Sequence, residues 1–548
     1  MNKEMTKASD HMTNHDAHTS ALNELSKLSS QIQLGGGKSR IQKHKEKGKL
    51  TARERIDYLF DNPKDAIEIG EFAAHQMYAE HGGCPSAGVV VKIGKVSSKM
   101  VIVVANDATV KAGAWFPMTA KKNLRAQEIS IENKIPIIYL VDSAGVYLPM
   151  QDEIFPDKEH FGRIFRNNAK MSSQGILQIS AIMGSCVAGG AYLPIMSDEA
   201  LIVEKTGSIF LAGSYLVKAA IGENIDNETL GGAHTHSVIS GVTDYKVKDD
   251  FEALDTIKSI LDKSNVQCAG TFERSKTKIP EFKSETVLDY FPSDRSKPYD
   301  MRKIIKTIVD QGSITEYKKE YGQTLLTLYA KIDGWSVGIV ANQREIVKNA
   351  KGEMQIGGVI YSDSADKAAR FIANCNQKKI PLIFFQDVTG FMVGSKSEHE
   401  GIIKDGAKMV NAVSNSVVPK FTFILGNSYG AGNYAMCGKA YDPRFIFSWP
   451  SAQLAVMSGN SAAKVLLQIE SSRLTKSGHE LSEEKSKALY DKIKASYDNQ
   501  ISPVYAASRL WTDGIIDPSK TRELISKGIE IASYNANIDT YNPGILQV

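Results

Sequence analysis

The chain has 548 residues, more than one hydrophobic core usually supports, so at least two domains are expected. Its net charge of +4 is small for this length, and its 42% hydrophobic and 23% charged residues are typical of globular proteins, so no nucleic-acid partner is indicated. The five cysteines are far apart and form no Cys-x-x-Cys pair, which argues against a disulfide framework or zinc ribbon and for a reducing compartment.

No uninterrupted apolar run approaches the roughly 20 residues that span a bilayer. The N-terminal sequence has no arginine before Arg40 and no apolar signal-peptide core, so neither organelle import nor secretion is indicated. We therefore expect no membrane association and a cytoplasmic location.

Residues 1–34 form a polar N-terminal extension. We expect residues 1–20 to be disordered because they are polar. Leucines recur at helical spacing over residues 22–28, which predicts a short amphipathic helix that the glycines at 35–37 interrupt.

The segment from Lys38 to Arg55 is densely basic. Within it, Thr51 and Glu54 have the spacing of a capping box that opens a helix toward Leu59. Two interpretations are open: a solvated helix face, or an electrostatic landing site for an anionic ligand such as a nucleotide phosphate.

Beyond residue 88, short apolar strands alternate with helices in both halves of the chain. This alternation is typical of a mostly parallel sheet covered by helices, so an α/β fold is expected. The expected strands are residues 89–91, 100–105, 137–141, 325–330, 337–341 and 382–386, and the expected helices include residues 119–133 and 365–376.

One sequence plan occurs twice. Residues 133–145 match residues 376–390, with their prolines 245 positions apart, and residues 182–192 match residues 424–434, with their tyrosines 242 positions apart. Self-similarity on this scale indicates two related domains in tandem.

The repeat and a polar join place the two domains at residues 35–285 and 286–548. Counted between the matching asparagine and proline residues, the first copy has 30 positions and the second has 39. The nine extra residues are expected in the charged, glycine-containing loop 348–358.

Each half has a turn of small residues between an apolar strand and an expected helix, Ala188-Gly189-Gly190 and Gly430-Ala431-Gly432. Without bulky side chains, backbone N–H groups can point outward, and at a helix N-terminus they feel the positive end of its dipole. These are the requirements of an oxyanion hole. Close helix–strand packing is the alternative, which the occurrence of two matched copies disfavours.

Further motifs extend over residues 35–540: Val104–Lys111, Leu124–Ile129, Phe155–Asp157, His160–Phe165, Met183–Cys186, Ile209–Gly213, Thr389–Gly394, Gly406–Val410 and Gly432–Gly438. They resemble the carboxyltransferase (beta) subunits of biotin-dependent acyl-CoA carboxylases, and within that family most of all the 3-methylcrotonyl-CoA carboxylases. The family has two crotonase-like (ClpP/crotonase) domains per chain, so the resemblance implies a tandem pair of such α/β domains.

The resemblance implies an enzyme that moves CO2 from carboxybiotin, carried on a partner subunit, to an acyl-CoA. In the family the N-terminal domain serves the acyl-CoA and the C-terminal domain serves biotin, and both pass through oxygen anions. Carried over, the backbones of Ala188, Gly189 and Gly190 would stabilise the thioester enolate. Those of Ala431 and Gly432 would stabilise the biotin enolate, and no side-chain base is demanded.

Other residues match the family's binding regions with less support. Phe391 and Gly394 correspond to the lining of the biotin pocket, and Gly430 opens the biotin-side turn. Asn106 and Lys111 are candidates for the nucleotide end of CoA, although Lys111 is equally well interpreted as a surface lysine.

Two pairs of polar residues have simpler interpretations. The two histidines at 234 and 236 have no carboxylate or cysteine at ligand spacing, so no metal is expected on this chain. Asp142 and Asp387 end equivalent strands and are expected to cap the loops that follow.

The chain departs from the 3-methylcrotonyl type at residues 142–149, which read Asp-Ser-Ala-Gly-Val-Tyr-Leu-Pro where that type usually has Asp-Ser-Gly-Gly-Ala-Asn-Leu-Pro. The expected substrate is 3-methylcrotonyl-CoA, converted to 3-methylglutaconyl-CoA as in leucine degradation. Propionyl-CoA, geranyl-CoA or another acyl-CoA stays open.

The chain contains neither a Met-Lys-Met biotinylation site nor a phosphate-binding loop, so a biotin carboxylase/biotin carboxyl carrier (alpha) subunit is the expected partner. The family assembles as hexamers in which each active site combines two subunits, so a homo-oligomer within a larger hetero-oligomer is expected. Two other classes stay open. A crotonase-type hydratase or isomerase would need a carboxylate pair, for which Asp198 and Glu199 are candidates, and a non-catalytic scaffold would not need both turns.

Overall fold

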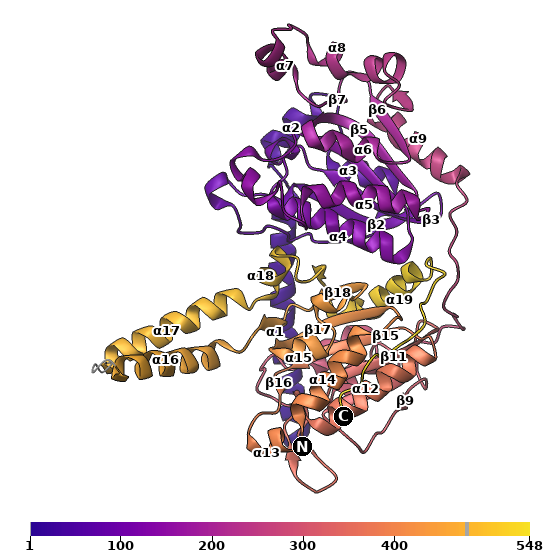
Figure 1. Cartoon of the computed structure of the whole chain (residues 1–548). Coiled ribbons are helices and arrows are strands. Elements are labelled where there is room, and N and C mark those ends of the chain that lie inside the picture. The colour runs from indigo at the N-terminus through magenta and orange to yellow at the C-terminus, as the bar shows by residue number, and fades with distance from the viewer. Residues whose placement is uncertain (1, 477–481) are drawn as a thin grey trace.

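Two eight-stranded sheets, one in each half of the chain, form the centre of the molecule (Figure 1). The computed structural model describes residues 2–476 and 482–548. The first sheet consists of β1 (Ile67–Glu68), β2 (Val89–Val96), β3 (Lys99–Asn106), β4 (Ile137–Ser143), β5 (Gln178–Val187), β6 (Glu199–Val203), β7 (Ser208–Phe210) and β8 (Tyr245–Val247). The second consists of β9 (Thr315–Glu316), β10 (Leu325–Ile332), β11 (Trp335–Asn342), β15 (Leu382–Val388), β17 (Lys420–Tyr429), β18 (Phe445–Ser448), β19 (Gln453–Ala455) and β20 (Gly514–Ile515).

The two sheets share one strand order. The path β2-β3-β4-β5-β6 in the first corresponds to β10-β11-β15-β17-β18 in the second, and in each path the first pair is antiparallel and the later pairs are parallel. A short strand also branches off each path, β7 beside β5 and β19 beside β17. The tandem repeat expected from the sequence is therefore a repeat of topology, and the α/β class is confirmed.

Helices cover both faces of each sheet, as the continuous apolar strands require. Every residue of β4 and of β15 is buried. The helices are α1 (Asn2–Ile32), α2 (Lys38–Lys45), α3 (Ala52–Leu59), α4 (Pro117–Asn133), α5 (Phe161–Ser173), α6 (Tyr192–Ile195), α7 (Ser214–Ile221), α8 (Asn227–Gly231), α9 (Asp250–Lys263), α10 (Val287–Tyr290), α11 (Met301–Ile305), α12 (Ser362–Gln377), α13 (Ser395–His399), α14 (Ile402–Ser414), α15 (Ala431–Ala435), α16 (Gly459–Lys476), α17 (Glu483–Gln500), α18 (Pro503–Ser508) and α19 (Thr521–Ala532).

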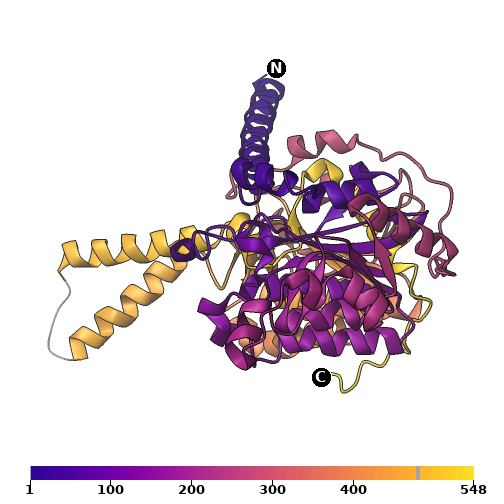
Figure 2. The ribbon, with the colours of Figure 1, turned by 90° about the horizontal axis from the view of Figure 1, so that it is seen from above.

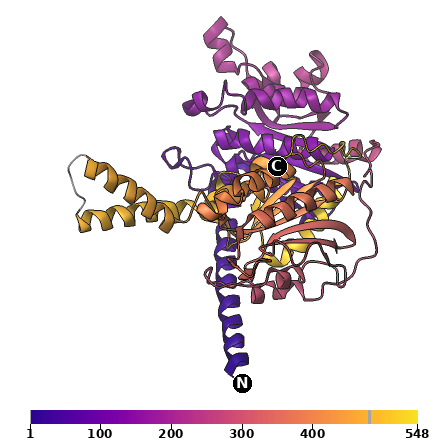
Figure 3. The ribbon, with the colours of Figure 1, turned by 60° about the horizontal axis from the view of Figure 1, so that its bottom comes forward.

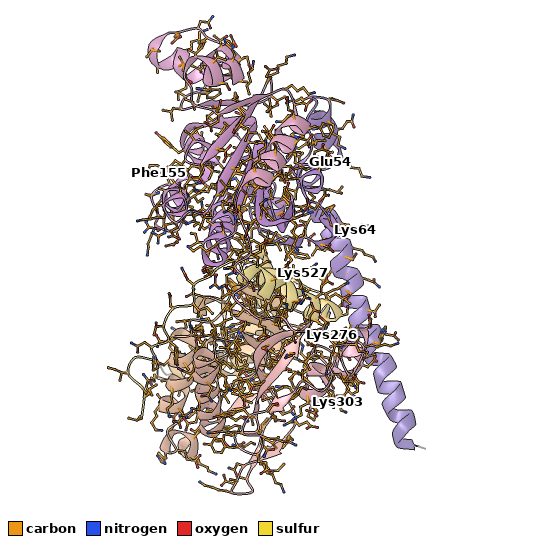
Figure 4. The ribbon with its side chains drawn as sticks, turned by 90° about the vertical axis from the view of Figure 1, so that its right-hand side faces the viewer. Glu54, Lys64, Phe155, Lys276, Lys303 and Lys527 are labelled. Carbon is orange, nitrogen blue, oxygen red and sulfur yellow. The ribbon has the colours of Figure 1, made fainter. Side chains whose placement is uncertain are left out.

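The two halves are packed against each other. One continuous apolar cluster includes Ile102 and Tyr139 of the first sheet together with Leu328 and Phe445 of the second. Helix α19 belongs to the same cluster, and Lys527 on it donates a hydrogen bond to the carbonyl oxygen of residue 65 in the first half (Figure 4). A core shared in this way holds the halves as one body.

The N-terminal extension is helical, contrary to the disorder expected for residues 1–20. Helix α1 runs from residue 2 as a straight rod that leaves the body (Figures 2 and 3). Its stability comes from tertiary contacts. His18 bonds through Nε2 to the carbonyl oxygen of Phe291 at 2.9 Å, and Asn14 accepts a hydrogen bond from the hydroxyl of Ser293, also at 2.9 Å.

The nine extra residues of the second copy form a small antiparallel hairpin. In the first half 11 positions separate the end of β3 from the start of α4, and in the second half 20 separate the end of β11 from the start of α12. The additional chain contains β12 (Val347–Lys348) and β13 (Met354–Gln355), which pair with each other. The insertion therefore lies where the sequence comparison placed it.

Helices α16 and α17 form a long antiparallel arm that projects from the second half (Figure 1). Within residues 2–476 and 482–548, no helix is long and apolar enough to cross a membrane.

Candidate active site

The turn of the first half opens with a left-handed residue. Strand β5 ends at Val187, and Ala188 follows with φ of +57° at the start of a 3-10 turn, Ala188–Ala191. A positive φ is uncommon for a residue that has a Cβ. The chain therefore changes direction at Ala188, immediately before Gly189 and Gly190.

The turn of the second half also begins with a residue of positive φ. Strand β17 ends at Tyr429, and Gly430 follows with φ of +54° as the residue before α15. Cys186 and Ser428 occupy the same register position in their sheets, so Ala188 corresponds to Gly430. The counterparts of Ala431 and Gly432 are therefore Gly189 and Gly190.

Backbone donors are available in both turns. The first N–H groups of a helical segment have no acceptor within it, and these turns place them beside residues with little or no side chain. Ala188 and Ala431 are exposed, whereas Gly190 and Gly432 are buried. Each turn can thus offer preorganised donors to an oxygen that becomes negative.

A buried thiol, that of Cys186, lies in β5 just before the first turn. Burial raises the pKa of Cys186 to about 12, and the nearby charge of Asp142 acts in the same direction. Its Sγ donates to the carbonyl oxygen of Gly190 at 3.3 Å. The side chain therefore supports the turn.

Two buried aspartates lie behind the turns, and the expectation that they cap the following loops is wrong. Asp142 is 2.6 Å from Nζ of Lys49 and 3.2 Å from Nη1 of Arg55. Asp387 is 3.2 Å from Nε of Arg344 and accepts a hydrogen bond from the hydroxyl of Tyr299 at 2.9 Å. Long-range cationic and hydroxyl partners replace the local amides that a cap would use.

The basic segment 38–55 supplies part of this neutralisation. Arg55 also bonds through Nε to Asp250 at 2.8 Å. Lys49 is largely buried, and that burial lowers its pKa even beside Asp142. With Arg53 paired to Glu68, these cations are engaged within the chain.

Asn106 and Lys111 lie on the first-half side of the site. Asn106 ends β3, and its Oδ1 accepts a hydrogen bond from the backbone N–H of Asp142 at 3.3 Å. Lys111 begins a short 3-10 segment with φ of +49°. Its ammonium group lies close to Gly82, since a Cβ built there would be 3.1 Å from Nζ.

Phe391 lies beside the second-half turn. It belongs to β16 (Gly390–Phe391), which pairs with β14 (Val359–Ile360). A Cβ on Gly432 would meet Val388 at 2.6 Å and the Cα of Gly390 at 3.4 Å, so this turn lies directly against the start of β16.

Gly394 opens α13 with φ of +110° and lines a hollow of about 600 Å³. The β12–β13 hairpin forms another wall of this hollow, and Glu353 of the hairpin pairs with Lys396 of α13 at 2.5 Å. The insertion therefore lies next to the segment predicted to line the biotin pocket.

Tyr147, one of the residues that departs from the 3-methylcrotonyl pattern, joins an aromatic cluster. Its ring stacks on Phe116 with centroids 4.3 Å apart and meets His81 edge-on at 5.3 Å. The loop that carries it begins at the end of β4, near the first-half turn, because a Cβ on Gly145 would lie 3.1 Å from the carbonyl oxygen of Val187.

The sequence interpretation did not single out Phe161, Gly184 and Gly426. The Phe161 ring lies 3.2 Å from where a Cβ on Gly189 would be. Gly184 and Gly426 face the carboxylates of Asp142 and Asp387. The signal for the two glycines was present, because both halves have glycine at this position in aligned motifs.

The histidines at 234 and 236 show no metal-site geometry. His236 bonds through Nε2 to the carbonyl oxygen of Ile209 at 2.7 Å and through Nδ1 to Ser240 at 2.9 Å. In the part of the chain that the structure describes, no three His, Cys, Asp or Glu residues are grouped for metal binding.

Comparisons with known proteins identify the family of the chain. The family model described as "Carboxyl transferase domain" matches residues 43–543. The chain therefore belongs to the carboxyl transferase domain family and is an enzyme of the carboxyltransferase class. The resemblance to carboxyltransferase subunits of biotin-dependent acyl-CoA carboxylases is confirmed.

Particular relatives are 3-methylcrotonyl-CoA carboxylase subunits. The chain is 44% identical over 533 residues to the biotin-dependent 3-methylcrotonyl-coenzyme A carboxylase beta1 subunit of Mycobacterium tuberculosis, covering 97% of this chain and 98% of the relative. It is 45% identical over 537 residues to the probable mitochondrial methylcrotonoyl-CoA carboxylase beta chain of Drosophila melanogaster, covering 95% and 90%. The crystal structure of the geranyl-CoA carboxylase beta subunit of P. aeruginosa superposes with a TM-score of 0.86 at 32% identity, covering 98% of both chains. The tandem crotonase-like fold is thereby confirmed.

Proposed function

We propose that this chain is the carboxyltransferase subunit of a 3-methylcrotonyl-CoA carboxylase, which carboxylates 3-methylcrotonyl-CoA to 3-methylglutaconyl-CoA. The observation that carries the proposal is the duplicated turn, with a residue of positive φ at Ala188 and at Gly430 and the start of a helical segment beside each. The two relatives at 44% and 45% identity support this choice of acyl-CoA.

The two turns have different tasks in this proposal. The N–H groups of the first turn, Ala188 to Gly190, hold the thioester oxygen while negative charge develops on it. Those of Ala431 and Gly432 hold the corresponding oxygen on the biotin side. A biotin on the partner supplies the carboxyl group, and this chain contributes binding and orientation.

In this proposal the biotin ring lies beside Gly390 and Gly394. Gly390 and Gly394 face open space, since a Cβ built on either would have no neighbour within 4 Å. Glycine backbones at such positions permit close approach of a planar ligand. Together with Phe391 they form the proposed biotin pocket, while Asn106 and Lys111 stay candidates for the nucleotide end of CoA.

A second chain completes the site in this proposal. Figure 1 places α6 and α15, which follow the two turns, in different halves of the molecule. Large apolar side chains of the helices that follow the turns are exposed, Tyr192 in the first half and Tyr434 in the second. A hexamer that joins the first half of one chain to the second half of another would cover them. The partner is the biotin-carrying alpha subunit, and the proposed location is the cytoplasm.

Geranyl-CoA is the second candidate substrate. The structural neighbour with a TM-score of 0.86 is a geranyl-CoA carboxylase subunit. Tyr147 and its aromatic neighbours stand where the sequence departs from the 3-methylcrotonyl pattern. Propionyl-CoA is a third candidate substrate.

The hydratase alternative has little structural support. Glu199 pairs in register with Ile179, which precedes Ala188 by about 25–30 Å of strand at roughly 3.3 Å per residue. Asp198 accepts hydrogen bonds from Ser172 and from the N–H of Gln178 at the same distant edge. These carboxylates lie away from the turn.

The test combines the chain with its biotinylated partner, ATP and labelled bicarbonate, and offers 3-methylcrotonyl-, geranyl-, propionyl- and acetyl-CoA separately. Label chiefly in 3-methylcrotonyl-CoA supports the full proposal. Label chiefly in another acyl-CoA supports the proposed reaction but identifies that acyl-CoA as the substrate. No label in any of them, with a partner shown to carboxylate its own biotin, overturns the proposal in favour of a hydratase or a scaffold.

A further inference from the structure

Both halves contain the same irregularity just before the turn. Between Val141 and Ser143 the partner strand advances from Ile182 to Cys186. Between Gln386 and Val388 it advances from Ile424 to Ser428. In each sheet a single aspartate, Asp142 or Asp387, is therefore opposed by three residues of the neighbouring strand. Such a bulge bends its strand locally.

The middle residue of each bulge is a glycine whose missing side chain makes room for the aspartate. A Cβ on Gly184 would overlap Oδ1 of Asp142, and a Cβ on Gly426 would lie 2.6 Å from Oδ1 of Asp387. Both aspartates are 4% exposed. Each carboxylate therefore fills the space above its bulge, and no larger side chain fits between them.

Each carboxylate is also tied to the backbone of its bulge. In the second half, Oδ1 of Asp387 accepts a hydrogen bond from the N–H of Asn427 at 2.8 Å. In the first half the connection passes through Arg55, which donates to Asp142 at 3.2 Å and to the carbonyl oxygen of Met183 at 3.4 Å. Different partners thus produce one constraint on the same three-residue segment.

The segment leads directly into the turn. Ala188 lies four positions after Gly184, and Gly430 lies four positions after Gly426. The left-handed residue follows the bulge in both halves, so the bend of the bulge determines the direction in which the turn leaves the sheet. A shift of about 1 Å in donor position is enough to impair catalysis.

We propose that Asp142 and Asp387 are equivalent positioning residues, each of which holds the bulge that aims the amide donors of its own turn. Neither touches substrate. The inference rests on the proposed function, because it assigns Asp142 to the acyl-CoA side and Asp387 to the biotin side. Asp142 is held in place by Lys49 and Arg55. Asp387 is held in place by Arg344 and Tyr299.

The main experiment separates the two sides in Asp142→Ala and Asp387→Ala. The biotin side is measured as the rate at which labelled carboxybiotin on the partner subunit loses its carboxyl group in the absence of acyl-CoA. The acyl side is followed as binding of acyl-CoA by calorimetry and as kcat of the full reaction. We expect both variants to lower kcat by about 10²-fold, the loss typical of a misplaced oxyanion donor. Only Asp387→Ala is expected to slow loss of the carboxyl group.

Matched controls are available in the same halves. Glu68→Gln removes a half-buried carboxylate of the first half that pairs with Arg53 at 2.7 Å. Asp310→Asn removes a buried carboxylate that pairs with Arg522 at 2.6 Å. Both controls are expected to lower the Tm without lowering kcat more than about 3-fold, since neither carboxylate faces a turn.

A second pair of variants keeps every charge. Gly184→Ala and Gly426→Ala should displace the carboxylates and reproduce the losses of their own halves. Asp387→Asn should regain at least ten-fold in kcat over Asp387→Ala, because its amide oxygen can still accept from the N–H of Asn427.

The outcomes distinguish the two proposals. If the unmodified chain transfers no carboxyl group with a charged partner, the proposed function fails. If it transfers the carboxyl group but the aspartate variants lose no more kcat than their controls, the positioning role is overturned. It is also overturned if both aspartate variants slow both sides equally.

Discussion

Arg125 on α4 donates two hydrogen bonds to the buried carboxylate of Asp513, from Nε at 2.9 Å and from Nη2 at 2.8 Å. The two residues lie 388 positions apart and belong to opposite halves of the repeat. Lys439 adds a third cationic contact at 3.0 Å, and the N–H of Ile446 donates to the same carboxylate. This buried group fastens the first half to the C-terminal part of the second.

Removing one partner of this group should destabilise the protein. The contacts with Arg125 and Lys439 hold the pKa of Asp513 well below its ordinary value of 3.8 although burial opposes them. Its stabilising contribution is therefore complete above pH 3.8 and is lost as pH falls further. Asp513→Ala should cost about 3–5 kcal/mol, measured as a lower Tm at pH 7. A Tm unchanged to within a degree would contradict this role.

Two lysines at equivalent positions should make stability depend on alkaline pH. Lys122 and Lys367 are both buried, and burial lowers their pKa values to about 7 and about 8. The unfolded chain binds more protons than the native one between these values and 10.5, so stability should rise with pH across that range. Lys122→Met should reduce the slope, by up to about 1.4 kcal/mol per pH unit, in Tm measured from pH 7 to 10. The control is Lys170→Met, which removes an exposed lysine on α5 of the same half.

Substitutions in the two turns should separate the two ligands. Ala431 is exposed at the start of α15, so Ala431→Phe is compatible with the fold and should block biotin-dependent turnover while leaving acyl-CoA binding within about two-fold. Gly190 faces open space, and Gly190→Val should instead weaken acyl-CoA binding. Calorimetry measures acyl-CoA binding by both variants, and the labelled-bicarbonate assay measures their turnover. Loss of acyl-CoA binding in Ala431→Phe would argue against the division of tasks between the halves.

Deleting residues 347–355 should leave the fold intact. The first half has no counterpart of this hairpin, and Val347 pairs with Gln355, so the flanking residues are close enough to be joined. The lost ion pairs, such as that between Glu353 and Lys396, are exposed and contribute little. A thermal melt should show a Tm within about 3 °C of the parent chain. Unfolding of the second half would mean that the hairpin is part of its core.

Much of the fold could be predicted from local pattern. The apolar runs at 137–141 and 382–386 became β4 and β15, and the small-residue turns lie where the repeat placed them. Strand, turn and helix preferences depend on residues within a few positions of each other, which a single sequence displays directly.

Helix α1 shows the limit of such reasoning. Its polar composition suggested disorder, yet it is helical, with His18 bonded to Phe291, 273 residues away. A partner that distant contributes nothing to a local pattern, and packing supplies most of the stability of helices in proteins.

The sequence by itself determined that the chain has two copies of one α/β plan, each with a turn able to present backbone donors. Only the tertiary structure decided that Ala188 and Gly430 both have a positive φ, and which cations neutralise the carboxylates of Asp142 and Asp387. The physical reason is the distance along the chain over which each interaction acts. Backbone conformation follows from neighbours in the chain, whereas a buried charge is stable only beside partners that the topology brings from far away.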